Sequence, residues 1–176
     1  MILDEIQTGC GRTGKFFAYE HDKVKPDIVT LAKGLANGIP IGATISREDI
    51  ANSFEKGDHG STFGGNPVAC SAANFTIDCV LKNKLMKNAE KQGNYIMKKL
   101  SSIKSKHIKE IRGKGLMIGM EMKDKAADIQ KNCLEKSLLI NLTAEKVLRF
   151  LPPLTISRKI IDDAFKILNK VIENED

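Results

Sequence analysis

Residues 27–42 read Asp-Ile-Val-Thr-Leu-Ala-Lys-Gly-Leu-Ala-Asn-Gly-Ile-Pro-Ile-Gly, and Lys33 lies near the middle of this stretch. The residues Ile28, Val29 and Thr30 predict a short buried strand directly before the lysine, and a glycine-rich turn follows it. A lysine packs poorly at such a position, but its amine can reach a ligand that the backbone approaches closely. We therefore take Lys33 as a candidate for holding a carbonyl cofactor as a Schiff base.

A second candidate segment opens the chain. Met1, Ile2 and Leu3 are apolar and lead into the polar run 4–7, Asp-Glu-Ile-Gln, as at the carboxyl end of a strand in a parallel sheet. Ligands bind at that edge of open α/β sheets. The glycine-rich residues 8–14 predict a loop. Because a domain rarely begins inside a core strand, we expect the chain to be the second part of a longer protein.

The stretch after Lys33 alternates strand and helix signals. Residues 41–46 predict another strand, and residues 47–50 predict a helix opening with Ser46 as its cap. Residues 57–67 form a polar, glycine-rich loop, after which Pro67 suits the first turn of a helix that runs to Leu81. That helix is rich in small residues, which predicts close packing on both sides.

The last part of the chain has a different character. We predict an amphipathic helix over 85–100, a β-hairpin over 108–122 that turns near Gly113 and Gly115, and a helix over 125–136. Short strands are predicted over 138–141 and 147–151, and a closing helix over 157–172. The residues expected inside that helix are Ile160, Ile161, Ala164, Ile167, Leu168 and Val171.

These elements predict an α/β protein with three parts. Residues 1–83 form part of a large domain with a mostly parallel sheet, residues 84–104 a bridging helix, and residues 105–176 a small α+β domain.

Composition excludes several classes of protein. The 176 residues are 41% hydrophobic and 28% charged, as in globular proteins. The net charge is +6, but the chain has two Tyr and no Trp, so it offers no stacking platform for nucleic acid. There is no apolar run long enough for a membrane span and no signal-peptide pattern, so we expect a cytoplasmic protein. The four cysteines lack the spacing of a zinc site or a disulfide framework.

The chemical candidates suit pyridoxal phosphate. Asp4 could keep the pyridine nitrogen protonated, Lys33 could react with the aldehyde, and Ser61 and Thr62 could bind the phosphate. Arg149, which lies three residues before the pair Pro152–Pro153, is a further candidate. Each residue also has a structural interpretation: a strand-end cap, a surface lysine, an ordinary loop or an ion pair. Their combination and order favour the functional interpretation.

Three segments carry a family resemblance. Residues 3–14 (Leu-Asp-Glu-Ile-Gln-Thr-Gly-Cys-Gly-Arg-Thr-Gly), 26–43 and 59–67 (His-Gly-Ser-Thr-Phe-Gly-Gly-Asn-Pro) resemble the cofactor strand, lysine segment and phosphate loop of class-III aminotransferases. The resemblance implies the fold-type I architecture of pyridoxal-phosphate-dependent transferases. Residues 112–119 and 139–153 make the chain most similar to the acetylornithine subgroup, which implies a place in arginine biosynthesis.

The resemblance also implies roles at the cofactor. Lys33 would carry the Schiff base and then shuttle a proton, while Asp4 would pair with the pyridinium. Ile6 would pack on the ring and Gln7 would bind near the ring oxygen. Glu5 belongs to the same cofactor-lining segment.

Further implied roles concern substrates and a second subunit. Thr62 would bind the phosphate of a neighbouring subunit in a homodimer with shared active sites, and Ser61 would contact the substrate. Arg149 would position or gate a carboxylate. The implied reactants are N-acetylornithine, 2-oxoglutarate and glutamate, with no nucleic acid and no membrane partner.

Two alternatives remain open. The amino donor could instead be that of an ornithine, succinylornithine or 4-aminobutyrate aminotransferase. The family's N-terminal half, which supplies the rest of the cofactor pocket, has no counterpart here. The chain alone could therefore be an inactive fragment or a dimerisation module.

Overall fold

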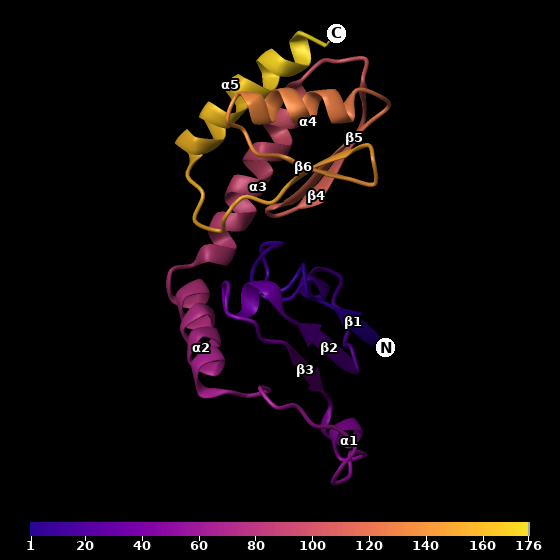
Figure 1. The fold of residues 1–176 in the computed structure, drawn as a ribbon, viewed down its shortest axis with the longest axis vertical. Helices are drawn as coiled ribbons and strands as arrows, with labels where there is room; N and C mark the ends of the chain where they lie inside the picture. Colours follow the sequence, from indigo (N-terminus) through magenta and orange to yellow (C-terminus); the bar gives the residue numbers. More distant parts are fainter. Residues whose placement is uncertain (176) are drawn as a thin grey trace. The chain divides into compact units, whose positions relative to one another are not determined.

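The computed structural model describes residues 1–175, and the chain divides into two compact units, Met1–Met86 and a second unit that begins at Lys87 (Figure 1). Each unit has its own sheet and its own hydrophobic core.

The first unit is built on a three-stranded mixed sheet in the order β1-β2-β3. Strand β1 (Ile2–Asp4) pairs in parallel with β2 (Ile28–Leu31), and β2 pairs antiparallel with β3 (Ala43–Ser46). The α/β class is confirmed, and the three strands combine one parallel pairing with one antiparallel pairing.

Short helices connect these strands, and a longer helix follows them. They are the 3-10 helices η1 (Ala18–His21) and η2 (Lys33–Leu35), and the α-helices α1 (Glu48–Ala51) and α2 (Pro67–Lys82). Helix α2 begins as predicted with Pro67 in its first turn, and the Asn66 side chain accepts a hydrogen bond from the Ala69 backbone N–H. The prediction that Ser46 caps α1 was wrong, because Ser46 pairs with Ile28 in the sheet and Arg47 occupies the cap position.

The core of the first unit is small. Cys10, Leu31, Leu35, Ala36 and Ala73 are its buried members. Helix α2 buries one face only, since Val68 and Phe75 on the same helix are 71% and 75% exposed. The predicted close packing of α2 on both sides is therefore not found within residues 1–175.

The second unit contains a four-stranded antiparallel sheet in the order β4-β5-β7-β6. Its strands are β4 (Ile108–Lys114), β5 (Met117–Met122), β6 (Asn141–Thr143) and β7 (Val147–Phe150), and its helices are α3 (Leu85–Ser102), α4 (Ala126–Glu135) and α5 (Arg158–Glu173). The predicted hairpin is confirmed as β4 and β5.

Strand β6 begins later in the sequence than the strand predicted over residues 138–141. Helix α4 ends at Glu135, and the turn that closes it extends to Leu138, so β6 begins only at Asn141. Ser137 has a positive φ of 62°, and the Leu138 N–H donates to the Cys133 carbonyl at 2.8 Å. This is the way a left-handed residue commonly closes a helix.

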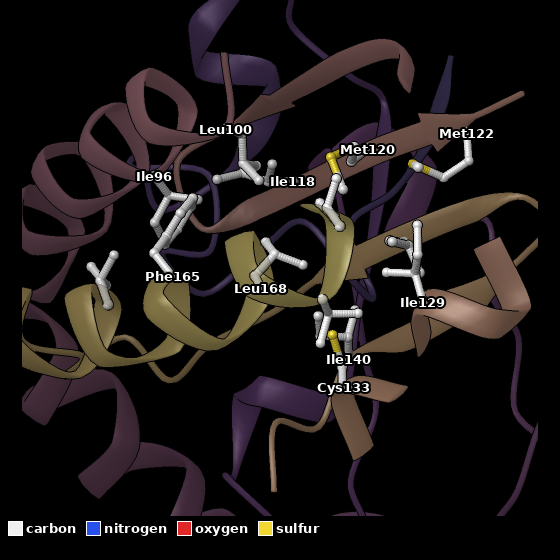
Figure 2. Close-up of a cluster of buried hydrophobic side chains, with 14 of the residues drawn as sticks. Ile96, Leu100, Ile118, Met120, Met122, Ile129, Cys133, Ile140, Phe165 and Leu168 are labelled. Carbon is white, nitrogen blue, oxygen red and sulfur yellow. The ribbon is translucent and has the colours of Figure 1, made fainter. Parts of the chain in front are cut away.

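The helices and one face of this sheet enclose the larger core of the protein. Figure 2 shows side chains from α3, β5, α4 and α5 meeting there, among them Ile96, Leu100, Ile118, Met120, Ile129, Cys133, Phe165 and Leu168. Ile160 was predicted to lie inside but is 59% exposed, while Phe165 and Ile172 are buried. The apolar stripe of α5 is therefore rotated away from Ile160.

Candidate active site

Asp4 and Lys33 lie at the same edge of the first sheet. Asp4 is the last residue of β1 and pairs with Thr30 of the parallel strand β2. Strand β2 ends at Leu31, and Lys33 begins η2 two residues later. Because the carboxyl ends of parallel strands share one edge, a carboxylate and a primary amine both lie at the edge where open α/β sheets bind ligands.

The segment after β1 crosses this edge. The Ile6 backbone N–H donates to Asp4 Oδ1 at 2.9 Å, which fixes the exposed carboxylate at the strand end. Ile6 is half-buried and Gln7 is exposed.

Glu5 points into the protein. It is only 3% exposed. Its Oε1 accepts a hydrogen bond from the Tyr19 backbone N–H at 3.0 Å, and its Oε2 accepts one from the Thr8 hydroxyl at 2.5 Å. Both contacts hold the glycine-rich loop against β1. No local sequence pattern indicates that Thr8 and Tyr19 bond to Glu5.

The same loop buries Cys10 beside the Lys33 turn. A β-carbon placed on Gly34 would lie 3.6 Å from Cys10 Cβ, an ordinary contact distance. Burial raises the pKa of the Cys10 thiol, and the negative charge of Glu5 raises it further. Cys10 is therefore held as a neutral thiol that packs against the turn.

Lys33 has an unusual backbone conformation. Its φ is +46°, in the left-handed region that residues other than glycine seldom adopt, and its side chain is exposed. Such strain persists only where the surroundings enforce it, and it concentrates at functional sites. Neither strand propensity nor glycine content could have predicted this conformation.

Ser61 and Thr62 lie in the exposed loop between α1 and α2. Two hydrogen bonds lie within this loop: the Gly64 backbone N–H donates to Ser61 Oγ at 3.0 Å, and Asn66 Nδ2 donates to the Phe63 carbonyl at 2.9 Å. The loop therefore presents two hydroxyls on a compact turn just before the N-terminus of α2.

Arg149 belongs to the second unit. It lies on β7, opposite Gly119 of β5 and Asn141 of β6. It is half-buried and lines a largely apolar depression of about 430 Å³ together with Phe150 and Pro152.

Residues 1–175 contain neither a membrane-spanning helix nor a metal-binding cluster. No helix in this range is long and apolar enough to cross a bilayer. No group of three or more His, Cys, Asp or Glu side chains there is placed to hold a metal ion.

Comparison with known proteins identifies the family. The family model described as aminotransferase class-III matches residues 1–172. The acetylornithine aminotransferase of Aquifex aeolicus is 49% identical over 172 residues, which cover 98% of this chain and 44% of the relative. That of Bacillus subtilis is 44% identical, covering 98% of this chain and 45% of the relative. The chain thus spans less than half the length of these curated relatives.

Solved structures agree with this assignment. The crystal structure of acetylornithine aminotransferase from Elizabethkingia anophelis is 38% identical with a TM-score of 0.94, and the match covers 98% of this chain and 45% of that one. The ornithine aminotransferase of Toxoplasma gondii ME49 is also 38% identical, with a TM-score of 0.95 and coverage of 99% and 44%. The family match extends over nearly all of the chain and includes both the Asp4–Lys33 sheet edge and the Arg149 strand, so the chain belongs to the class-III aminotransferases.

Proposed function

We propose that the protein of which this chain is part transfers the amino group of N-acetylornithine to 2-oxoglutarate, with pyridoxal phosphate as cofactor. This chain contributes the reactive lysine, Lys33. The observation that carries the proposal is the placement of Asp4 and Lys33 at the carboxyl edges of adjacent parallel strands. The similarity to acetylornithine aminotransferases supports the choice of amino donor.

The residues at the sheet edge fit pyridoxal phosphate. When bound, this cofactor supplies an electron sink for bonds at the substrate Cα. Asp4 offers an anchored carboxylate that would keep a proton on the pyridine nitrogen. Lys33 offers an exposed primary amine that would hold the aldehyde carbon.

Lys33 would serve twice in the reaction. Its Nζ would hold the cofactor aldehyde, and as a free amine it would accept and return a proton at the substrate Cα as a general base and acid. The strained backbone of Lys33 supports this role, because it fixes the point from which the side chain leaves the sheet. Ile6 and Gln7 would line the cofactor, and Glu5 would hold the loop behind it.

The Ser61–Thr62 loop would act with a second subunit. Thr62 would bind a phosphate and Ser61 a substrate in a homodimer with shared sites. Large apolar side chains next to this loop support such a contact, since Phe63 is 80% exposed and Val68 is 71% exposed. Arg149 would receive a substrate carboxylate through a bidentate hydrogen bond.

A second candidate function is the same amino-group transfer with a different amino donor. Ornithine aminotransferases appear among the similar solved structures at the same identity as the acetylornithine enzyme. Ornithine, succinylornithine and 4-aminobutyrate therefore belong in the substrate test. A further alternative is that the 176-residue chain alone is an inactive fragment or dimerisation module.

Absorbance spectroscopy tests the role of Lys33. The purified chain is mixed with pyridoxal phosphate and scanned for the band of a lysine-bound cofactor, alongside Lys33→Ala and the control Lys25→Ala, an exposed lysine in a loop. We expect the band to be lost in Lys33→Ala and kept in the control. A band that is equal in all three proteins would contradict the assignment of Lys33.

Glutamate formation tests the substrate. The protein is incubated with 2-oxoglutarate and each candidate donor, and N-acetylornithine should give the largest kcat/KM. A larger value for ornithine would overturn the choice of donor and leave the lysine assignment intact. A Lys33-dependent band without turnover of any donor would favour the inactive-fragment alternative.

A further inference from the structure

A pocket lined by basic residues lies against helix α3 in the second unit. Its lining residues are Lys91, Asn94, Tyr95, Lys98, Lys99, Ser102 and Arg158, and its volume is about 530 Å³. Pockets that hold small ligands typically measure about 300–1,000 Å³. Four of the lining residues are cations and none is a carboxylate.

Two of the cations are held in place by an aromatic ring. Arg158, in the first turn of α5, has its guanidinium carbon 4.2 Å from the centroid of the Tyr95 ring, and Lys99 Nζ lies 5.4 Å from the same centroid. The Tyr95 hydroxyl donates to Asp162 Oδ1 at 2.6 Å, and Lys99 Nζ lies 2.8 Å from that oxygen. Cation–π contact and these hydrogen bonds immobilise both cations before any ligand arrives.

The other two cations extend the pocket along α3. Lys91 and Lys98 are seven residues apart, so they lie on one helical face two turns apart, on either side of Tyr95 in the sequence. Both are exposed. Their side chains can therefore close on a ligand that rests on the immobilised pair.

The charges in this region do not cancel. Asp162 contacts Lys99 and Tyr95, and its hydrogen bond raises the pKa of Lys99, which keeps that amine protonated at neutral pH. The lining has four cations and no carboxylate, and Asp162 is paired with Lys99 alone among the lysines, so the pocket keeps an excess of positive charge. Asp162 offsets one of the four cations, so a ligand with two or more negative charges would neutralise most of the remaining excess.

We propose that this pocket binds a small phosphorylated anion with two or more negative charges. Guanidinium and ammonium groups are the preferred donors to phosphate oxygens, and the Asn94 amide and Ser102 hydroxyl offer neutral donors at the rim. A nucleic-acid strand fits the pocket less well, because Arg158 already stacks on the one aromatic ring that a base could use.

Calorimetric titration of the 176-residue chain with inorganic pyrophosphate tests the proposal, in about 0.15 M salt so that exposed charges are screened. We expect saturable binding that Lys98→Glu weakens about tenfold or more, since the substitution removes a charged hydrogen-bond donor and places a negative charge in the pocket. Arg158→Gln should weaken it as well. The matched control is Lys131→Glu, an exposed lysine of α4 outside the pocket, which changes the net charge equally.

Three results would overturn the proposal. One is the absence of saturable pyrophosphate binding. Another is an equal loss of pyrophosphate affinity in Lys98→Glu and Lys131→Glu, which would mean that the total charge of the protein alone attracts the anion. The third is tighter binding of a short DNA duplex than of pyrophosphate, with the affinity for DNA reduced equally by both variants. Circular dichroism of each variant confirms that a lost affinity does not come from unfolding.

Discussion

At the scale of single residues, Glu121 is the most strongly perturbed carboxylate of the second unit. It lies on β5 with 10% of its side chain exposed. Lys109 donates to its Oε1 and Arg112 to its Oε2, both at 2.8 Å, and Lys146 Nζ lies 3.6 Å from Oε1. These hydrogen bonds, that of Lys109 first, lower the pKa of Glu121 from 4.5 to about 2.

The pKa of Glu121 makes stability depend on pH. Because the folded-state pKa is the lower one, the carboxylate stabilises the fold fully above pH 4.5, and this stabilisation is lost as pH falls toward about 2. We expect Glu121→Gln to lower the free energy of unfolding at pH 7 and to have little effect near pH 2. Urea unfolding of both proteins across this range measures the difference.

The control for this experiment is Glu135→Gln, an exposed glutamate of α4. It should change the free energy of unfolding little at any pH. A Glu121→Gln effect that stays constant from pH 7 to pH 2 would mean that the side chain acts through packing and not through its charge.

Single residues of the candidate site were predictable where their signal is local. The apolar run that ends in Asp4, and the strand and glycine turn around Lys33, are short-range patterns, and the structure places these residues at strand ends. The burial of Glu5 was not predictable, because its hydrogen-bond partner Tyr19 is 14 residues away and reaches it only through the fold of the loop. Ser46 was assigned wrongly because capping and strand pairing compete for the same residue.

At the scale of elements, helix α3 approaches the β4–β5 turn without space for a side chain. A β-carbon on Gly93 would lie 2.0 Å from the Gly115 carbonyl oxygen and 2.4 Å from its carbonyl carbon. Backbone atoms cannot move aside as the end of a flexible side chain can. Gly93 therefore sets how closely the helix packs on the hairpin.

A Gly→Ala substitution usually stabilises a helix, but at Gly93 we expect it to destabilise the protein. In a helix interior Gly→Ala normally gains about 1 kcal/mol, but here the added methyl group overpacks the contact, which costs about 1–3 kcal/mol or more. We expect Gly93→Ala to lower the free energy of unfolding, whereas Asn94→Ala, at the exposed neighbouring position, should leave it nearly unchanged. Denaturant midpoints of the two variants and the parent chain provide the test, and a stabilised Gly93→Ala would refute the close contact.

The contact between Gly93 and Gly115 separates what the sequence predicts in this region from what it does not. The hairpin and helix α3 were predictable because each depends on its own periodicity and turn residues. How they pack was not, because it depends on Gly93 and Gly115, which are 22 positions apart in the sequence. Strand β6 begins later in the sequence than predicted for a related reason. Leu138 bonds back to the end of α4, so strand pairing begins only at Asn141.

At the scale of the whole molecule, the two units differ in how much apolar surface they bury. The core of the second unit includes eleven side chains of Ile, Leu, Met and Val that are at most 2% exposed. In the first unit only five residues form the buried cluster. Large side chains there, including Ile2, Phe54, Phe63 and Phe75, are more than half exposed. Since burial of apolar area is the main favourable term in folding, the first unit has the smaller stabilisation.

This difference predicts unequal protection from hydrogen exchange in the 176-residue chain. Backbone amides of β1 to β3 should exchange through openings of lower free energy than those of β5 and β7, which lie at the centre of the second sheet. Mass spectrometry of exchange at the peptide level measures both sets in one sample. Pyridoxal phosphate bound through Lys33 should raise protection in β1 and β2 and leave β5 and β7 unchanged, because a ligand stabilises the part of the protein that binds it. Equal protection of the two sheets in the free chain would show that they unfold as one cooperative unit.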